Sequence, residues 1–141
     1  MLVHGPAGVG KTFAVATVLR EFSASLSERK AANEESKASH LLNVIRLTPA
    51  DLINAPKNEN QMIKQAFEDA VSKQPSVLWI EEVDYIAKSK GMFYSFLSSL
   101  DSFECCQSLV IATTSKLADV DKALRRGGRL DLDVVFEMPT A

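Results

Sequence analysis

The sequence predicts an α/β fold of three layers, in which a parallel sheet of about five strands carries helices on both faces. Short apolar runs alternate along the chain with segments whose apolar residues recur at helical spacing. The central run Val77–Ile80 is apolar at every position. Such runs are typical of parallel strands that are buried on both faces, so the alternation indicates strands joined by helices.

The strands and helices are expected at definite places. The strand-sized runs are Met1–His4, Asn43–Leu47, Val77–Ile80, Leu109–Thr113 and Val134–Phe136. The expected helices are Phe13–Phe22, with Val15, Ala16, Val18, Leu19 and Phe22 as apolar residues, Asn60–Lys73, the segment marked by Phe93, Phe96, Leu97, Leu100 and Phe103, and the short Asp121–Arg126. Residues 48–60 contain Pro49 and Pro56 and are expected to form a loop with room for one helical turn.

Residues 23–39 differ from the rest in being polar and rich in serine and alanine. Only Leu26 offers a large apolar side chain for burial there. We therefore expect an exposed helical extension or a loose insertion, and we interpret residues 1–141 as one α/β unit.

Composition excludes several classes of protein. The chain has 141 residues, of which 46% are hydrophobic, and its net charge of −2 does not provide the basic surface of a general nucleic-acid binder. Its apolar runs fall short of the ~18 residues of a membrane helix, and the start of the chain does not resemble a secretory signal. The adjacent Cys105 and Cys106 fit neither an ordinary disulfide nor a zinc site. We expect an intracellular, most simply cytoplasmic, protein.

A complete phosphate-binding motif, G-x-x-x-x-G-K-T, follows the first strand. Its glycines allow backbone N–H groups to turn toward a phosphate, and the N-terminus of the following helix adds positive potential. Lys11 is expected to reach the β- and γ-phosphates of a nucleoside triphosphate, and the Thr12 hydroxyl to bind Mg²⁺. The motif predicts a P-loop NTPase fold, with these nucleotide-binding residues: Gly5, Pro6, Ala7, Gly8, Val9, Gly10, Lys11 and Thr12.

Two carboxylates, Glu81 and Glu82, directly follow the apolar strand Val77–Ile80. Ligands bind at this carboxyl edge of parallel sheets. One carboxylate can hold the metal through water, and the next can polarise the attacking water. We therefore predict Glu81 as a metal-side residue and Glu82 as a catalytic residue.

The phosphate loop, the acidic strand end, Ile111–Ser115 and the stretch Asp121–Asp131 (DKALRRGGRLD) together resemble an AAA ATPase. The resemblance extends from Leu2 to Pro139 and covers the large nucleotide-binding subdomain. It implies ATP and Mg²⁺ as cofactors and assembly into a homo- or hetero-hexameric ring that acts on protein substrates or adaptors. It also implies that the helical lid subdomain lies beyond the chain and that the sequence is part of a longer protein.

The same resemblance assigns roles to three further residues. Ser115 falls at the sensor 1 position, and Arg126 and Arg129 fall at the arginine-finger positions, which act on the nucleotide of a neighbouring subunit. An arginine supplied in trans makes stabilisation of the transition state conditional on assembly.

Some residues depart from the family pattern. Glu81 stands where aspartate is usual, and Ser115 stands where asparagine is usual. The loop Asn54–Lys57, which aligns with the pore loop, has no aromatic residue. The segment that would carry a second pore loop, Ala87–Gly91, is short.

Three functions remain open from the sequence. The first is an ATP-hydrolysing module of a ring that remodels proteins, which Glu82, Arg126 and Arg129 favour. The second is a ring subunit that binds ATP for regulation or structure and hydrolyses it weakly, which Glu81, Ser115 and the pore loop favour. The third, a small P-loop kinase, leaves the Asp121–Asp131 stretch unexplained.

Overall fold

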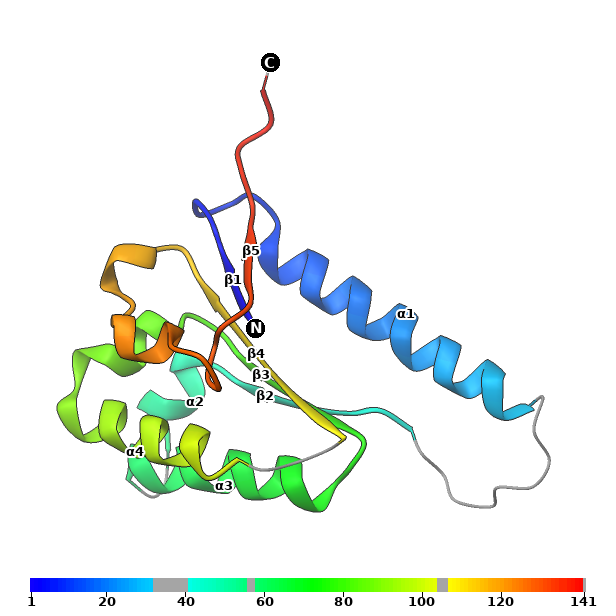
Figure 1. Cartoon of the computed structure of the whole chain (residues 1–141), viewed down its shortest axis with the longest axis horizontal. Helices are drawn as coiled ribbons and strands as arrows, with labels where there is room; N and C mark the ends of the chain where they lie inside the picture. The colour runs from blue at the N-terminus through cyan, green and yellow to red at the C-terminus, as the bar shows by residue number, and fades with distance from the viewer. Residues whose placement is uncertain (32–40, 56–57, 104–106, 141) are drawn as a thin grey trace.

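A computed structural model describes residues 1–31, 41–55, 58–103 and 107–140 (Figure 1). Its strands are β1 (Leu2–His4), β2 (Asn43–Leu47), β3 (Ser76–Ile80), β4 (Ser108–Thr114) and β5 (Asp133–Val135). Its α-helices are α1 (Lys11–Ala31), α2 (Pro49–Ile53), α3 (Glu59–Ser72) and α4 (Lys90–Asp101). Short 3₁₀ helices, η1 (Val83–Lys88), η2 (Leu117–Asp119) and η3 (Lys122–Arg125), complete the described part.

The strands form one parallel sheet in the order β2-β3-β4-β1-β5. The first strand of the chain therefore lies inside the sheet, with β4, β3 and β2 on one side of it and β5 on the other. Leu2 pairs with Ala112 of β4 and with Asp133 of β5. All carboxyl ends consequently meet at one edge, which collects the loop after β1 and the residues after β3 and β4.

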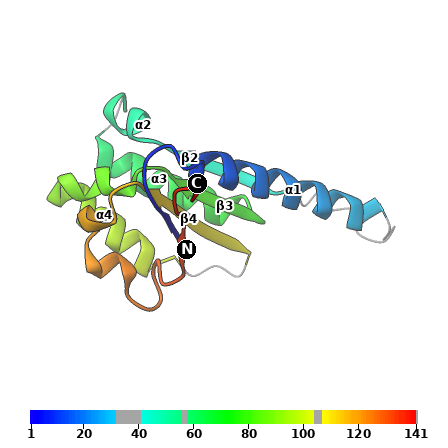
Figure 2. The ribbon, with the colours of Figure 1, turned by 90° about the horizontal axis from the view of Figure 1, so that it is seen from above.

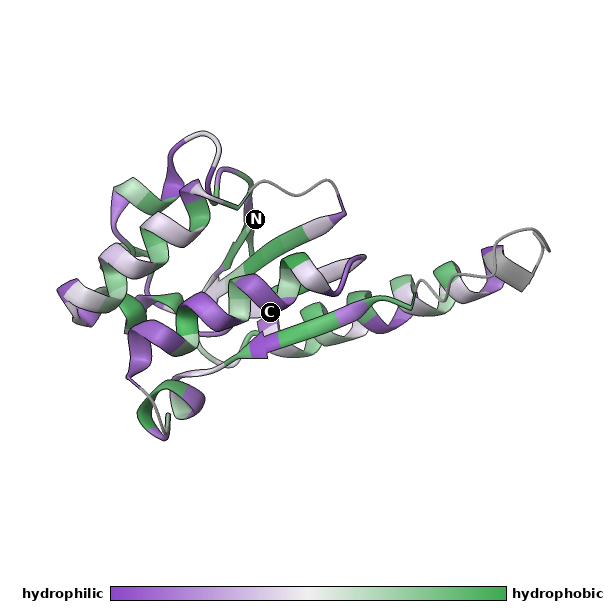
Figure 3. Cartoon of the chain, turned by 90° about the horizontal axis from the view of Figure 1, so that it is seen from below, coloured by the Kyte–Doolittle hydropathy of each residue, from purple (hydrophilic) through white to green (hydrophobic). Residues whose placement is uncertain are grey.

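Helices cover the two faces of the sheet unequally (Figures 1 and 2). The larger core lies beneath α3 and α4 and includes Ile63, Phe67, Leu78 and Phe96. The opposite core is small and is covered by α1; it consists of Val3, Val15, Leu19, Val77, Trp79 and Ile111. Hydrophobic residues concentrate in the strands, whereas hydrophobic and hydrophilic residues alternate along the helices (Figure 3). The three-layer α/β fold predicted from the sequence is thus confirmed.

Helix α1 is longer than the predicted Phe13–Phe22 and reaches well past the sheet (Figure 1). Its buried apolar residues, Val15 and Leu19, lie in its first half. Of residues 23–39, for which the sequence allows an exposed helical extension or a loose insertion, residues 23–31 continue this helix, and residues 32–39 lie outside the described part. The prediction that Ala16, Val18 and Phe22 supply apolar packing faces is wrong, because all three are exposed. Val18 directly precedes the buried Leu19 and lies on another side of the helix, and Phe22 comes after Leu19, the last buried residue among the described side chains of α1.

Two other local predictions are refined. Within residues 48–60 the expected helical turn is α2, which begins at a capping box in which Thr48 and Asp51 exchange hydrogen bonds. The short helix expected over Asp121–Arg126 is the 3₁₀ helix η3, capped by the Asp121 side chain. His40, Pro56, Lys57 and the cysteines 105 and 106 lie outside the described residues.

Replacement of Phe96 tests the larger core. Phe96 is fully buried and packs its ring 5.7 Å from that of Phe67. We expect Phe96→Ala to lower the free energy of unfolding by about 3–5 kcal/mol, because it removes a large apolar side chain and leaves a cavity. Tyr94→Ala, at an exposed position of the same helix, is the control and should cost less than about 1 kcal/mol in a urea titration. Equal losses for the two variants would contradict this assignment of the core.

Candidate functional site

The glycine-rich loop between β1 and α1 has a backbone that larger residues could not adopt. Gly5, Gly8 and Gly10 have φ values of 151°, 81° and 92°, in the region that favours glycine. A Cβ on Gly5 would collide with the backbone carbonyl of Phe136. That carbonyl is fixed close by, because the Phe136 N–H donates to the His4 carbonyl at 2.8 Å. The strand pair β1–β5 therefore requires glycine where the loop begins.

Lys11 is the first residue of α1, and its side chain is buried against this loop. Its ammonium group donates to the carbonyls of Gly5 and Pro6 at 2.7 Å each and to Ser115 Oγ at 3.0 Å. Burial lowers the pKa of Lys11, and the charge of Glu82 partly opposes that shift. The predicted phosphate-binding lysine and the predicted sensor residue are thus in direct contact although 104 positions separate them.

The acidic pair lies at the carboxyl end of β3. The backbone N–H of Glu81 donates to the carbonyl of Leu47, the last residue of β2, at 2.9 Å, which extends the strand pairing to Glu81. Glu82 has a left-handed backbone with φ of 48°, which turns the chain into η1. A non-glycine residue rarely adopts this conformation, so the fold holds Glu82 in a defined direction at some cost in backbone strain.

One open cavity of about 630 Å³ collects most of the predicted site. Its lining includes residues of the loop, both acidic residues and the end of β4. The lining residues are Ala7, Gly8, Gly10, Lys11, Thr12, Phe13, Ala16, Arg46, Trp79, Glu81, Glu82, Thr113, Thr114 and Ser115. The fold therefore places Lys11, Thr12, Glu81, Glu82 and Ser115 around one space at the carboxyl edge of the sheet.

Six residues of the cavity lining are not among the site residues predicted from the sequence: Phe13, Ala16, Arg46, Trp79, Thr113 and Thr114. Arg46 and Trp79 contact each other there. Trp79 was expected only in the core, and it is indeed buried. The Arg46 guanidinium lies over its ring at 4.7 Å and also pairs with Glu81 Oε1 at 2.6 Å. A basic residue near the end of a strand was the available signal, but the register that sets Arg46 beside Trp79 is a tertiary property.

The Asp84 carboxylate stabilises the end of β4 through a hydrogen bond from Thr114. Thr114 is buried and donates from Oγ1 to Asp84 Oδ1 at 2.7 Å. The same hydroxyl oxygen accepts the Lys116 N–H at 3.0 Å. These bonds fix the backbone on both sides of Ser115, so the Ser115 hydroxyl is held next to Lys11.

Arg126 and Arg129 lie outside the cavity lining, in a segment anchored by the buried Leu124 and Leu130. Arg126 is exposed. Arg129 makes a two-pronged pair with Asp101, from Nε to Oδ1 at 2.7 Å and from Nη2 to Oδ2 at 2.8 Å, and its Nη1 donates to the Ala123 carbonyl. The hydrogen bond from Arg129 lowers the pKa of the Asp101 carboxyl. The two arginines thus differ, since Arg126 projects outward and Arg129 is engaged within the chain.

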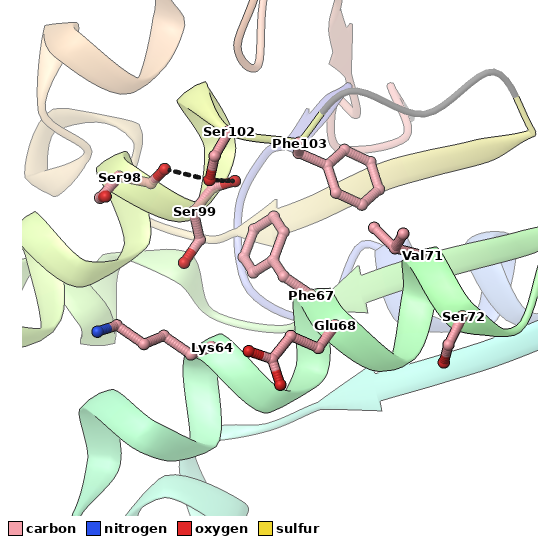
Figure 4. A pocket seen from close by; sticks show the side chains of 9 residues that line it. All are labelled: Lys64, Phe67, Glu68, Val71, Ser72, Ser98, Ser99, Ser102 and Phe103. Atoms are coloured by element: carbon pink, nitrogen blue, oxygen red, sulfur yellow. Dashed lines mark hydrogen bonds between the residues drawn. The ribbon is translucent and has the colours of Figure 1, made fainter.

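A further cavity of about 410 Å³ lies between α3 and α4, away from the phosphate loop (Figure 4). Phe67, Val71 and Phe103 form its apolar side, and Lys64, Glu68 and several serines form its rim. It contains none of the residues that the sequence assigned to nucleotide binding. The residues that the sequence predicts for nucleotide binding line the cavity at the sheet edge instead.

The residues at the sheet edge fit a magnesium ion only in part. The Thr12 hydroxyl lines the cavity and supplies one hard oxygen atom of the kind that Mg²⁺ prefers. Glu81, the predicted metal-side carboxylate, does not fit as placed, because it already pairs with Arg46. Among the described residues there is no cluster of three metal-binding side chains, and none of the helices is long and apolar enough to cross a membrane.

Comparison with known proteins yields a match over nearly the whole chain. The profile of the family described as "ATPase family associated with various cellular activities (AAA)" matches residues 1–138. Protein CdcH of Halobacterium salinarum is 30% identical over 99% of this chain and 18% of its own length. A proteasome-activating nucleotidase of Aeropyrum pernix is 28% identical over 99% of this chain and 33% of its own length. A proteasome-associated ATPase of Salinispora tropica is 27% identical, and the match covers 26% of its length. The chain therefore spans a third or less of these relatives.

Proposed function

The chain belongs to the AAA family of ATPases, and on that basis we propose that it is the large α/β nucleotide-binding subdomain of a ring-forming ATPase. In this proposal it binds and hydrolyses ATP inside the cell, and the ring, homo- or hetero-hexameric, remodels protein substrates or adaptor complexes. The names of the proteasome-associated relatives support proteins as the substrate class. The observation that carries the proposal is the meeting of Lys11, Thr12, Glu82 and Ser115 around one cavity.

Residues of the loop Gly5–Thr12 bind the triphosphate in this proposal. The glycine-permitted turns at Gly8 and Gly10 allow backbone N–H groups to approach phosphate oxygens, as does the N-terminus of α1. Lys11 supplies a buried positive charge that can exchange its carbonyl partners for phosphate oxygens. Thr12 would hold the magnesium ion, which supplies charge neutralisation when bound.

The catalytic roles fall to Glu82 and Ser115. Glu82 accepts a hydrogen bond from the attacking water, and its fixed left-handed backbone aims the carboxylate at one place in the cavity. Ser115 forms a hydrogen bond with groups at the γ-phosphate in this proposal, a role that its contact with Lys11 supports. A serine hydroxyl has a shorter reach than an asparagine amide, which supports a slower hydrolysis rate than in relatives that carry asparagine.

Arg126 and Arg129 act on the nucleotide of a neighbouring subunit in this proposal. The exposure of Arg126 supports such a role directly. For Arg129, the same role requires it to release Asp101, so assembly would have to compensate for that ion pair. The alternative function is a ring subunit that binds ATP and hydrolyses it weakly, which the pairing of Glu81 with Arg46 favours.

Removal of the Lys11 charge tests nucleotide binding. We expect Lys11→Ala to weaken ATP binding by about 1.5–3 kcal/mol, roughly 10- to 150-fold, because a charge-assisted phosphate contact is lost. Isothermal titration calorimetry measures the difference. Lys64→Ala, which removes the same charge beside the cavity between α3 and α4, is the control and should bind as the wild type does. Equal affinity of Lys11→Ala and wild type would mean that this loop is not the site.

Glu82→Gln separates the two candidate functions. In the assembled ring of the full-length protein, we expect steady-state hydrolysis to fall by about 10²-fold or more while ATP still binds, because an amide cannot accept the proton of the attacking water. Glu68→Gln, outside the nucleotide cavity, should leave turnover unchanged. A wild-type ring that binds ATP but hydrolyses it no faster than Glu82→Gln would instead establish the weakly hydrolysing alternative.

Mixing two inactive subunits tests the arginines. Replacement of both Arg126 and Arg129 by alanine should leave ATP binding by one subunit nearly intact and lower ring turnover by ~10³–10⁵-fold. When this variant is combined with Lys11→Ala subunits, some interfaces pair an intact loop with intact arginines, and hydrolysis should partly return. The arginines act within their own subunit if mixed hexamers stay inactive and the arginine-free subunit alone has lost ATP binding.

A further inference from the structure

Arg46 is the charged residue of the cavity to which nucleotide binding gives no role. It lies on β2, where its Nε donates a hydrogen bond to Oε1 of Glu81 at 2.6 Å and its Nη2 forms an ion pair with the same oxygen at 2.6 Å. Its guanidinium carbon is 4.7 Å from the centroid of the Trp79 ring. One carboxylate and one aromatic face therefore hold this cation at the edge of the nucleotide cavity.

This arrangement of Arg46, Trp79 and Glu81 is determined by the pairing of β2 with β3. The parallel register of β2 and β3 places Arg46 directly opposite Trp79, and Glu81 comes two residues after Trp79 on the same face of the sheet. Trp79 is 4% exposed, and the Glu81 side chain is 15% exposed. The anion and the aromatic ring are thus fixed by the sheet, and the half-exposed Arg46 side chain lies across both.

The arrangement has a consequence for metal binding. Glu81 stands at the position predicted to face the metal ion, and a guanidinium and a divalent cation both require the negative charge of this carboxylate. Arginine stays protonated at every physiological pH, so its charge is always present. A partly exposed ion pair is weak, so a metal ion can compete with Arg46 for Glu81 but gains less than it would from a free carboxylate.

We propose that Arg46 is a built-in counter-ion of Glu81 that competes with Mg²⁺ for this carboxylate and lowers the dependence of nucleotide binding on the metal. The inference rests on the proposed binding of ATP in this cavity. Without metal, Arg46 neutralises Glu81, so that of the acidic pair only Glu82 repels the triphosphate. With metal, the ion must share or displace Arg46. Both effects bring the affinities for free and metal-bound nucleotide closer together.

The test is the ratio of the dissociation constant of ATP in EDTA to that in excess Mg²⁺, measured by calorimetry on the same preparation. We expect Arg46→Gln to raise this ratio by roughly fivefold, because Glu81 then repels free triphosphate and binds the metal more readily. Arg20→Gln removes the same charge from an exposed position of α1 outside the cavity and should leave the ratio at its wild-type value.

A double-mutant cycle identifies Glu81 as the partner. In a Glu81→Gln background the carboxylate for which Arg46 and Mg²⁺ compete is absent. Adding Arg46→Gln to this background should therefore leave the ratio of the two dissociation constants unchanged. The proposal is wrong if Arg46→Gln leaves the wild-type ratio unchanged, or if its effect is equally large without Glu81, and in either case nucleotide binding itself still stands. If wild type binds no ATP with or without metal, the proposed function fails and this inference fails with it. Thermal unfolding of each variant verifies that the sheet is intact.

Discussion

The hydrogen bonds of the Lys11 ammonium group are the interactions on which the candidate site depends. A partly buried charge needs polar atoms in place of the water it loses, and here two loop carbonyls and the Ser115 hydroxyl supply them. The same three bonds join the start of α1, the glycine loop and the end of β4. The positive charge is therefore kept at the sheet edge by the geometry that also closes the loop.

That geometry in turn requires the parallel sheet. Because β1 lies between β4 and β5, the loop after β1 is next to the residues that follow β4. The bond from Phe136 to His4 aligns β5 so closely that Gly5 has no room for a side chain. Loop conformation, lysine burial and strand order are thus parts of one constraint, and a change in any of them would move the ammonium group.

The acidic side chains at and near the sheet edge each act on a different partner. Arg46 neutralises Glu81 at the cavity, whereas Glu82 influences Lys11 through its charge. Asp84 acts through a hydrogen bond to Thr114 and so holds the backbone beside Ser115. At a distance from the cavity, Asp101 at the end of α4 pairs with Arg129, whereas Arg126 is exposed. Glu81 and Asp101 therefore position cations, and Asp84 positions backbone.

The sequence by itself determined the fold class, the phosphate loop and the family, because these are written in local patterns. Apolar runs mark buried strands, helical spacing marks α3 and α4, and the spacing of Gly5, Gly10, Lys11 and Thr12 is a continuous motif. How far α1 extends remained open between a helical extension and a loose insertion, since the polar residues after Phe22 carry no packing signal and the helix continues to Ala31 without a core beneath it.

Only the tertiary structure decided which side chains meet. The contact of Lys11 with Ser115 depends on strand order, and the pairing of Arg46 with Trp79 and Glu81 depends on the register between β2 and β3. The engagement of Arg129 by Asp101 depends on how the segment after η3 packs beside α4. Local sequence sets what each residue can do, but long-range pairing sets its partner, because residues distant along the chain become neighbours only when the sheet has formed.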